Sequence, residues 1–216
     1  MDVIIDNLPT YLDGFLMTVR LTLYAAAFSL VLGVLLAALR VSPLRPLRAG
    51  AATFVELLRN TPLTLVFFFM YFVFPQFSVL PPVPFFWTAV VCLTLYTSAF
   101  VAEAMRSGIN SVGVGQAEAA RAIGLTFGQT LGSVVLPQAL RSVVPPLINV
   151  FIALTKNTSV AAGFAVVELV ASGRRLAQAN AGDPMIWVGI AAFYLAITVP
   201  MGVLAGRVER RVAFAR

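Results

Sequence analysis

Long stretches without any charged residue alternate with short, arginine-containing segments along this chain. The first such stretch runs from Leu21 to Leu39, and a longer one runs from Asn60 to Ala102. The hydrocarbon core of a bilayer is roughly 30 Å thick and requires about 20 apolar residues in a helix. The first stretch therefore predicts a membrane-spanning helix over residues 14–39.

The second stretch is too long for one crossing and contains several prolines, at positions Pro75, Pro81, Pro82 and Pro84. Because proline interrupts helices, this stretch predicts two spans, over residues 52–74 and 85–105, joined by a proline turn. Residues 142–167 are apolar except for Lys156 and predict a fourth span, over 142–164. The charge-free residues that begin at Pro184 predict a fifth, over 184–206. The chain is expected to be an all-α membrane protein with a single domain, residues 1–216.

Five crossings place the termini on opposite sides, and the distribution of arginine indicates which side is which. Most cations fall in two loops and the C-terminal tail, namely Arg40, Arg45, Arg48, Arg106, Arg121, Arg141, Arg207, Arg210, Arg211 and Arg216. The opposite side carries Arg174 and Arg175 and an acidic N-terminal segment. Short cytoplasmic loops are enriched in Lys and Arg, which predicts a cytoplasmic C-terminus and an external N-terminus.

The composition excludes several classes of protein. Hydrophobic residues make up 60% of the chain and charged residues only 11%, against roughly a quarter in soluble domains. The net charge of +6 follows from the cationic loops, so no nucleic-acid partner is expected. One cysteine, Cys92, and no histidine leave no components for a zinc site or a nucleophile–base pair. The first twenty residues lack the basic region of a cleavable signal peptide. We expect no metal, no cofactor and no catalysis of bond chemistry.

The predicted cytoplasmic loop over residues 106–141 contains a short segment that favours a helix. Residues 116–127 are rich in alanine and free of proline, and Ala119, Ile123 and Phe127 recur every four residues. Glu118 and Arg121 are spaced to form a salt bridge on the other face. Such a helix docks into a groove on another protein or lies on the membrane surface, and the residue pattern alone does not separate these two interpretations.

The sequence of this loop resembles the EAA loop of bacterial ABC importer permeases, whose pattern is E-A-A-x3-G-x9-I-x-L-P. The matching residues are Glu118, Ala119, Ala120, Gly124, Val134 (in place of Ile), Leu136 and Pro137. In that family the loop forms a coupling helix that sits in a cleft of the ATP-binding subunit. The resemblance assigns ATPase coupling to Glu118, Ala119, Ala120, Gly124 and Pro137. A structural role for Glu118, in which it only pairs with Arg121, is the alternative.

Two further segments resemble the polar amino acid permeases of the same family. Residues 56–63 read ELLRNTPL, against E-x-x-R-G-T-P-L in the family, with Asn60 in place of Gly. Residues 136–162 match the L-P-Q-A-x-R…P-x-x-x-N…K-x-T-S stretch. The resemblance covers residues 14–206 and implies the type I importer permease fold, with five transmembrane helices and a cytoplasmic coupling helix.

The resemblance also implies the partners: a dimer of ABC ATPase subunits, a second permease chain (identical or a sister chain) and an extracytoplasmic amino-acid-binding protein. The chain lacks the G-x-x-x-x-G-K-[ST] phosphate loop, so ATP hydrolysis is expected in a separate subunit. The implied location is the bacterial inner membrane, surrounded by lipid. The implied substrate is a polar amino acid, with glutamate or glutamine favoured. The alternatives are a permease for basic amino acids or another small polar solute, or a secondary carrier.

Lys156 is the main candidate for contact with a substrate inside the membrane. An unpaired lysine near the bilayer centre costs about 2.5–3.5 kcal/mol on insertion scales, so it lines a water-filled path, pairs with Glu56 or Glu103, or snorkels to the headgroups. Asn157, Thr158 and Ser159 add hydrogen-bonding groups that serve the path or helix packing. The absence of an acidic residue at position 157 favours an acidic or neutral substrate.

Glu56 and Arg59 lie one helical turn apart near the cytoplasmic start of the second predicted span. At that spacing they pair with each other or take part in the substrate path. Pro62 follows and is expected to kink the helix, at a point that the family resemblance places near the gate.

Overall fold

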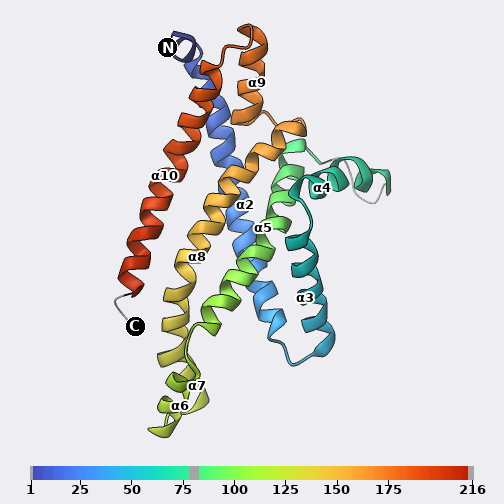
Figure 1. Cartoon of the computed structure of the whole chain (residues 1–216). Coiled ribbons are helices and arrows are strands. Elements are labelled where there is room, and N and C mark those ends of the chain that lie inside the picture. Colours follow the sequence, from blue (N-terminus) through green and yellow to red (C-terminus); the bar gives the residue numbers. More distant parts are fainter. Residues whose placement is uncertain (1, 78–82, 214–216) are drawn as a thin grey trace.

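The computed structural model describes residues 2–77 and 83–213, and every regular element over those residues is helical (Figure 1). The elements are α1 (Asp2–Asp6), α2 (Leu8–Arg40), α3 (Arg45–Asn60), α4 (Leu63–Phe68), η1 (Phe69–Val73), η2 (Phe74–Phe77), α5 (Phe85–Asn110), α6 (Val114–Ala122), α7 (Phe127–Thr130), η3 (Leu131–Val135), α8 (Leu136–Asn157), η4 (Thr158–Gly163), α9 (Leu169–Ala179) and α10 (Met185–Ala213). The all-α fold predicted from the sequence is confirmed over these residues.

Four stretches of the described chain are long and apolar enough to cross a bilayer: Leu8–Arg40, Phe85–Asn110, Phe127–Gly163 and Met185–Arg211. A fifth crossing results if α3 and the helical segments that follow it are counted together. In Figure 1 the long helices α2, α5, α8 and α10 extend between the two ends of the molecule. Helix α9 lies at the end that holds the N-terminus, whereas α6 and α7 lie at the opposite end.

The second predicted span, residues 52–74, differs from the structure and is corrected here. Helix α3 begins at Arg45 and ends at Asn60, and the helical segment from Leu63 to Phe77 is inclined to it by 107°. Thr61 has extended backbone angles, and Pro62, which cannot donate a backbone hydrogen bond, precedes the first turn of α4. The span is therefore broken at Thr61–Pro62, and α4 turns sideways from the bundle (Figure 1).

The proline turn expected between the second and third spans is only partly covered by the described residues. Pro75 lies inside η2, and Pro84 immediately precedes the first residue of α5. The predicted turn residues Pro81 and Pro82 lie outside the described residues. Pro84 has a non-helical ψ of 140°, and its carbonyl oxygen accepts from the Trp87 amide at 2.9 Å and the Thr88 amide at 3.1 Å, so α5 begins directly after it.

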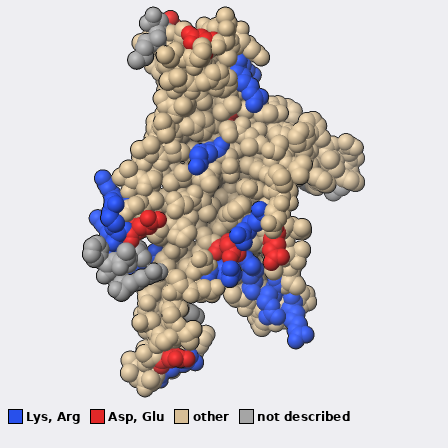
Figure 2. Space-filling view, viewed as in Figure 1, with Lys and Arg blue, Asp and Glu red and all other residues tan. Residues whose placement is uncertain are grey.

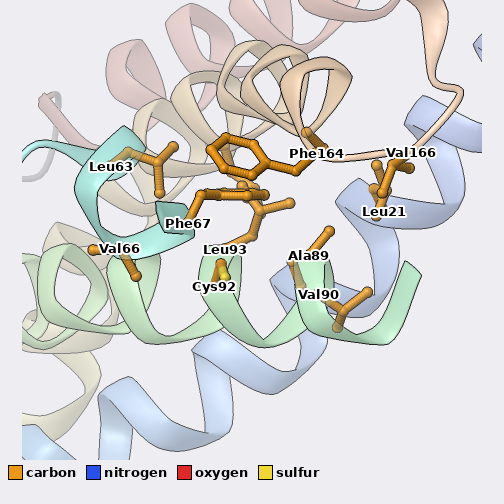
Figure 3. Close-up of a cluster of buried hydrophobic side chains, with 13 residues drawn as sticks. Leu21, Leu63, Val66, Phe67, Ala89, Val90, Cys92, Leu93, Phe164 and Val166 are labelled. Carbon is orange, nitrogen blue, oxygen red and sulfur yellow. The ribbon is translucent and has the colours of Figure 1, made fainter. Parts of the chain in front are cut away.

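Three clusters of buried apolar side chains hold the helices together. The largest joins α2, α4, α5 and α8 to the segment after η4, and in it the rings of Phe67 and Phe164 lie 5.0 Å apart (Figure 3). The second lies toward the N-terminal end and contains Tyr11, Leu169, Leu176, Ile186 and Ile190. The third lies toward the α6 end and contains Leu36, Ala51, Val55, Ala99 and Ala102. Helix α5 contributes to two of the clusters and occupies the centre of the bundle.

Helices α2 and α5 approach each other closely at Gly33. A Cβ atom added to Gly33 would lie 2.5 Å from the Val101 Cβ and 3.0 Å from the carbonyl oxygen of Ser98. Small residues permit such close helix contacts in membranes, where van der Waals packing replaces the hydrophobic effect as the main attraction. This contact fixes the position of α5, which carries much of the candidate site described below.

Replacing Gly33 by leucine is expected to destabilise the folded protein by about 1–3 kcal/mol, because the added side chain overpacks the α2–α5 contact. A lower thermal midpoint in detergent would report this loss. Gly50→Leu is the matched control, since no atom lies within 4 Å of a Cβ at that position. Equal midpoints for the two variants would contradict the close approach.

Candidate functional site

A cavity of about 360 Å³ lies between the middle of α5 and the second half of α8. Its lining residues are Tyr96, Thr97, Phe100, Asn149, Val150, Ala153, Leu154 and Asn157. Ligand pockets in proteins have volumes of about 300–1,000 Å³ and combine apolar walls with a few polar groups. The volume lies in this range, and the lining is mainly apolar with a few polar groups.

One face of α8 borders this cavity. Asn149, Ala153 and Asn157 are spaced four residues apart, so they lie along a single stripe of the helix. Lys156 is three residues after Ala153, which places it at the edge of the same stripe, and its side chain is exposed. Of the four consecutive polar residues from Lys156 to Ser159, the structure brings Asn157 into the cavity lining.

The hydroxyl groups of Thr158 and Ser159 bond to their own helical turn. Thr158 is fully buried, and its hydroxyl donates to the Thr155 carbonyl oxygen at 2.7 Å. Ser159 donates to the Lys156 carbonyl oxygen, also at 2.7 Å. These bonds satisfy backbone groups where α8 changes to the tighter helix η4, and they stabilise the turn that carries Asn157.

The end of α5 nearest α6 carries a cluster of four charged side chains centred on Glu103. Arg40 Nη1 lies 2.8 Å from Glu103 Oε2, and Arg59 Nη1 lies 3.3 Å from the same oxygen. Arg106 donates from Nε to Glu103 Oε1 at 2.9 Å. Glu103 and Arg106 lie three residues apart on α5 and form a salt bridge. The cluster links α2, α3 and α5 through one carboxylate.

Among the described residues, Glu56, Arg59 and Lys156 do not form the salt bridges with one another or with nearby acidic residues that the sequence suggested for them, except that Arg59 pairs with Glu103. Arg59 pairs with Glu103 on α5, whereas Glu56 is exposed and makes no salt bridge within the described residues. Lys156 makes no salt bridge with Glu56 or Glu103 in that part of the chain. The pairing of Lys156 with Glu56 or Glu103, one of the alternatives that the sequence left open, does not occur among the described residues. In Figure 2 charged side chains lie near the upper end and across the lower half of the molecule, and the surface between them is uncharged apart from one isolated cationic patch.

Glu168 is a buried carboxylate whose importance the sequence did not reveal. Glu168 is not among the candidate residues predicted from the sequence, but its side chain is fully buried. Glu168 Oε1 accepts a bond from the Ala171 amide at 2.9 Å and so caps α9. Its Oε2 accepts from the Tyr194 hydroxyl at 2.9 Å and from Thr18 at 3.5 Å. One side chain therefore joins α2, α9 and α10.

Burial raises the pKa of the Glu168 carboxyl, whereas its hydrogen bonds from the backbone and from the Tyr194 and Thr18 hydroxyls act in the opposite direction. No Lys or Arg within the described residues forms a salt bridge with it. The one available sequence signal was its position just before a helical segment. Glutamate is not among the preferred N-cap residues, so that signal was weak.

The helix predicted over residues 116–127 is shorter than expected and begins earlier. Helix α6 spans Val114–Ala122, and Gly124 follows it with a φ of +90°. The Leu125 amide donates to the Ala120 carbonyl oxygen at 3.1 Å, and the Gly124 amide donates to that of Arg121 at 3.0 Å. This pair of bonds is a Schellman motif, which ends a helix at a left-handed residue. Glycine adopts that conformation without steric cost, so the helix stops before Phe127.

The residues of α6 divide between a buried and an exposed face. Ala120 is buried, whereas Glu118 and Ala119 are exposed. The apolar residues Ile123 and Phe127 have exposed fractions of 81% and 78%. Arg121 donates to the Ala117 carbonyl oxygen at 3.3 Å, and no Glu118–Arg121 salt bridge occurs among the residues that the structure describes. Pro137 lies in the first turn of α8. The tip of the molecule therefore presents a short helix with a free carboxylate and unpaired apolar side chains.

The described helices define a class: an integral membrane protein with a small, mainly apolar cavity between its spans and an exposed helix at one end. Comparison with known proteins gives the family. The model of the binding-protein-dependent transport system inner membrane component family matches residues 29–214. The chain belongs to this family. It is a permease subunit of an ABC importer and a multi-pass membrane protein, and ATP hydrolysis is the work of a separate ATPase subunit.

Similar proteins agree with this membership over nearly the whole chain. The glutamate transport system permease protein GluC of Corynebacterium glutamicum is 40% identical, with 95% of each chain covered. The probable glutamine ABC transporter permease protein GlnM of Bacillus subtilis is 37% identical, over 98% of this chain and 97% of that one. A crystal structure of an amino acid ABC transporter with histidines matches at a TM-score of 0.90 and 29% identity, covering 96% of both chains.

Replacing Glu168 by alanine is expected to lower stability by about 1–3 kcal/mol, because the Tyr194 hydroxyl and the first turn of α9 lose their buried acceptor. The thermal midpoint of the purified protein measures this effect. Glu209→Ala removes an exposed carboxylate from α10 and serves as the control. If both variants melt like the unmodified protein, Glu168 does not hold the three helices together.

Proposed function

We propose that this chain forms one half of the transmembrane path of an importer for a polar amino acid, with glutamate or glutamine as the favoured substrate. The cavity between α5 and α8 carries the proposal, because its volume of about 360 Å³ and its polar groups suit a single amino acid. The names of the relatives support the substrate class, since they include glutamate and glutamine permeases.

Within the cavity, Asn149 and Asn157 offer amide groups that both donate and accept hydrogen bonds. Both suit the ammonium and carboxylate groups that every amino acid carries. Lys156 borders the same stripe of α8 and places a cation where a substrate carboxylate passes. Thr158 and Ser159 support this turn through their backbone hydrogen bonds. An uncharged residue at position 157 fits an acidic or neutral substrate better than a cationic one.

Helix α6 is the proposed docking element for the ATPase dimer. Apolar residues exposed at the tip of a protein are typical of an interaction surface, and Ile123 and Phe127 are such residues. Glu118 and Ala119 lie on the exposed side of α6, where a carboxylate and a small side chain can enter a groove of the partner. Gly124 ends the helix sharply, and Pro137 starts α8, which leads from α6 to the cavity.

The distribution of cations favours one orientation in the membrane, and this orientation suggests where the extracytoplasmic binding protein and the second permease chain contact the protein. With the α6 end in the cytoplasm of a bacterial cell, the N-terminus and α9 face the outside. The exposed side chains of Arg174 and Arg175 on α9 then lie where an extracytoplasmic binding protein delivers the amino acid. A second permease chain, identical or a sister, completes the path in the inner membrane.

Uptake of radiolabelled glutamate, glutamine, arginine and histidine by cells with and without this chain tests the proposed function. We expect selective loss of glutamate or glutamine uptake when the chain is absent. Unchanged uptake of all four amino acids would contradict the proposed substrate class.

Glu118→Lys is expected to leave the protein in the membrane while lowering ATP-dependent uptake at least tenfold, because a cation replaces the carboxylate at the docking surface. Uptake and ATP hydrolysis by the assembled transporter, measured in liposomes, report this uncoupling. Glu209→Lys makes the same charge change at an exposed position of α10 and is expected to transport normally. Normal uptake by Glu118→Lys would exclude Glu118 from coupling.

A further inference from the structure

The turn that joins α2 to α3, residues 41–48, forms a cationic corner of the molecule. This α2–α3 corner lies toward the α6 end of the bundle, to one side of α6 (Figure 1). Arg45 and Arg48 are exposed there, and neither forms a salt bridge within the part of the chain that the structure describes. The guanidinium of Arg48 donates weakly, at 3.5 Å, to the Ser42 carbonyl oxygen. Residues 41–55 contain no Asp or Glu, so no neighbour along the chain neutralises the two cations.

Exposed apolar side chains accompany the arginines in the α2–α3 corner. Leu44 and Leu47 have exposed fractions of 59% and 46%. They are three residues apart, as are Arg45 and Arg48, so an apolar stripe and a cationic stripe run side by side where α3 begins. A helix end with this pattern suits the surface of a bilayer, with its apolar side chains toward the acyl chains and its cations toward the headgroups.

The length of α2 indicates how deep the corner lies in a membrane. The charge-free part of α2, Leu21–Leu39, contains 19 residues and is about 28 Å long at a rise of about 1.5 Å per residue. This length nearly equals the roughly 30 Å of a bilayer core. The α2–α3 corner begins two residues after Leu39. Arg45 and Arg48 are therefore expected at the level of the lipid phosphate groups.

The other cations toward the α6 end have different surroundings. The three arginines around Glu103 are held by its carboxylate. Arg210 and Arg211 are exposed on α10, but they directly follow the carboxylate of Glu209. The α2–α3 corner differs from both groups, because it combines two guanidinium groups and exposed leucines with no carboxylate in its sequence neighbourhood.

We propose that the α2–α3 corner binds the phosphate headgroup of an anionic phospholipid in the leaflet at the α6 end. A guanidinium fork matches two phosphate oxygens with parallel hydrogen bonds, and Leu44 and Leu47 contact the upper part of the acyl chains. A bound lipid stabilises the folded protein, because it binds only the folded state. It also fastens the start of α3, whose Ala51 and Val55 pack against α5.

The test is binding of radiolabelled phosphatidylglycerol and phosphatidylcholine with identical acyl chains, presented in mixed micelles to the immobilised full-length protein. The two lipids share the phosphate group and differ in net charge. The unmodified protein is expected to bind phosphatidylglycerol at least about tenfold more tightly, since each cation at an anionic surface contributes a factor of about five. The double variant Arg45→Gln with Arg48→Gln is expected to reduce this preference to about twofold.

The double variant Arg210→Gln with Arg211→Gln is the matched control, because it removes the same charge from exposed positions of α10. It is expected to keep the preference. Equal losses in the two double variants would overturn the proposal, since the whole cationic end would then attract anionic lipid without a defined site. Displacement of the lipid by an equal concentration of inorganic phosphate would also overturn it, because the corner would then be a site for free phosphate.

A measurement on the unmodified protein keeps the proposal testable if the Arg45→Gln, Arg48→Gln variant does not fold. Raising the salt concentration from about 0.1 M to about 1 M shortens the Debye length from about 10 Å to about 3 Å. The two arginines are exposed, so this change is expected to remove most of the preference for phosphatidylglycerol. A preference that does not change with salt would contradict binding through these arginines.

Discussion

A bilayer core supplies no water to hydrogen-bond polar groups, and this constraint determines where charges occur in the described chain. Glu103 is surrounded by three arginines. Glu168, without a cation, receives one backbone amide and two hydroxyl groups. Both carboxylates also join helices that are distant in sequence. These two carboxylates therefore hold together the α6 end and the N-terminal end of the bundle.

Because polar groups are costly in the bilayer core, the polar side chains at the cavity between α5 and α8 point to a function of that cavity. Asn149 and Asn157 border it in an otherwise apolar region, and polar side chains inside membrane spans usually serve a solute path. Helix α8 extends from the exposed tip at α6 to Asn157, and it contains Pro145 and Pro146, which remove two backbone donors from its middle. The proposed coupling of α6 to the cavity therefore runs through α7, η3 and a helix that lacks two backbone donors in its middle.

Four of the five predicted spans overlap the long apolar helices of the structure, because hydropathy over 20 residues reflects the bilayer thickness. The EAA pattern placed α6 within a few residues, but the end at Gly124 depended on a local left-handed backbone. Pro62 predicted a kink in the second span, but the angle of 107° depends on packing. The Arg59–Glu103 contact and the burial of Glu168 were beyond sequence reasoning, because each partner lies on another helix and no local pattern specifies such pairs.

The most direct test of the account is whether substrate occupies the cavity beside Asn157. Cys92 is the single cysteine and is buried, so a cysteine introduced by Asn157→Cys is expected to dominate labelling by a small water-soluble thiol reagent. In the assembled transporter, saturating glutamate or glutamine is expected to slow this labelling several-fold. Labelling at the exposed α9 position in Gln178→Cys is expected to be unaffected. Equal labelling rates at position 157 with and without substrate would contradict a path between α5 and α8.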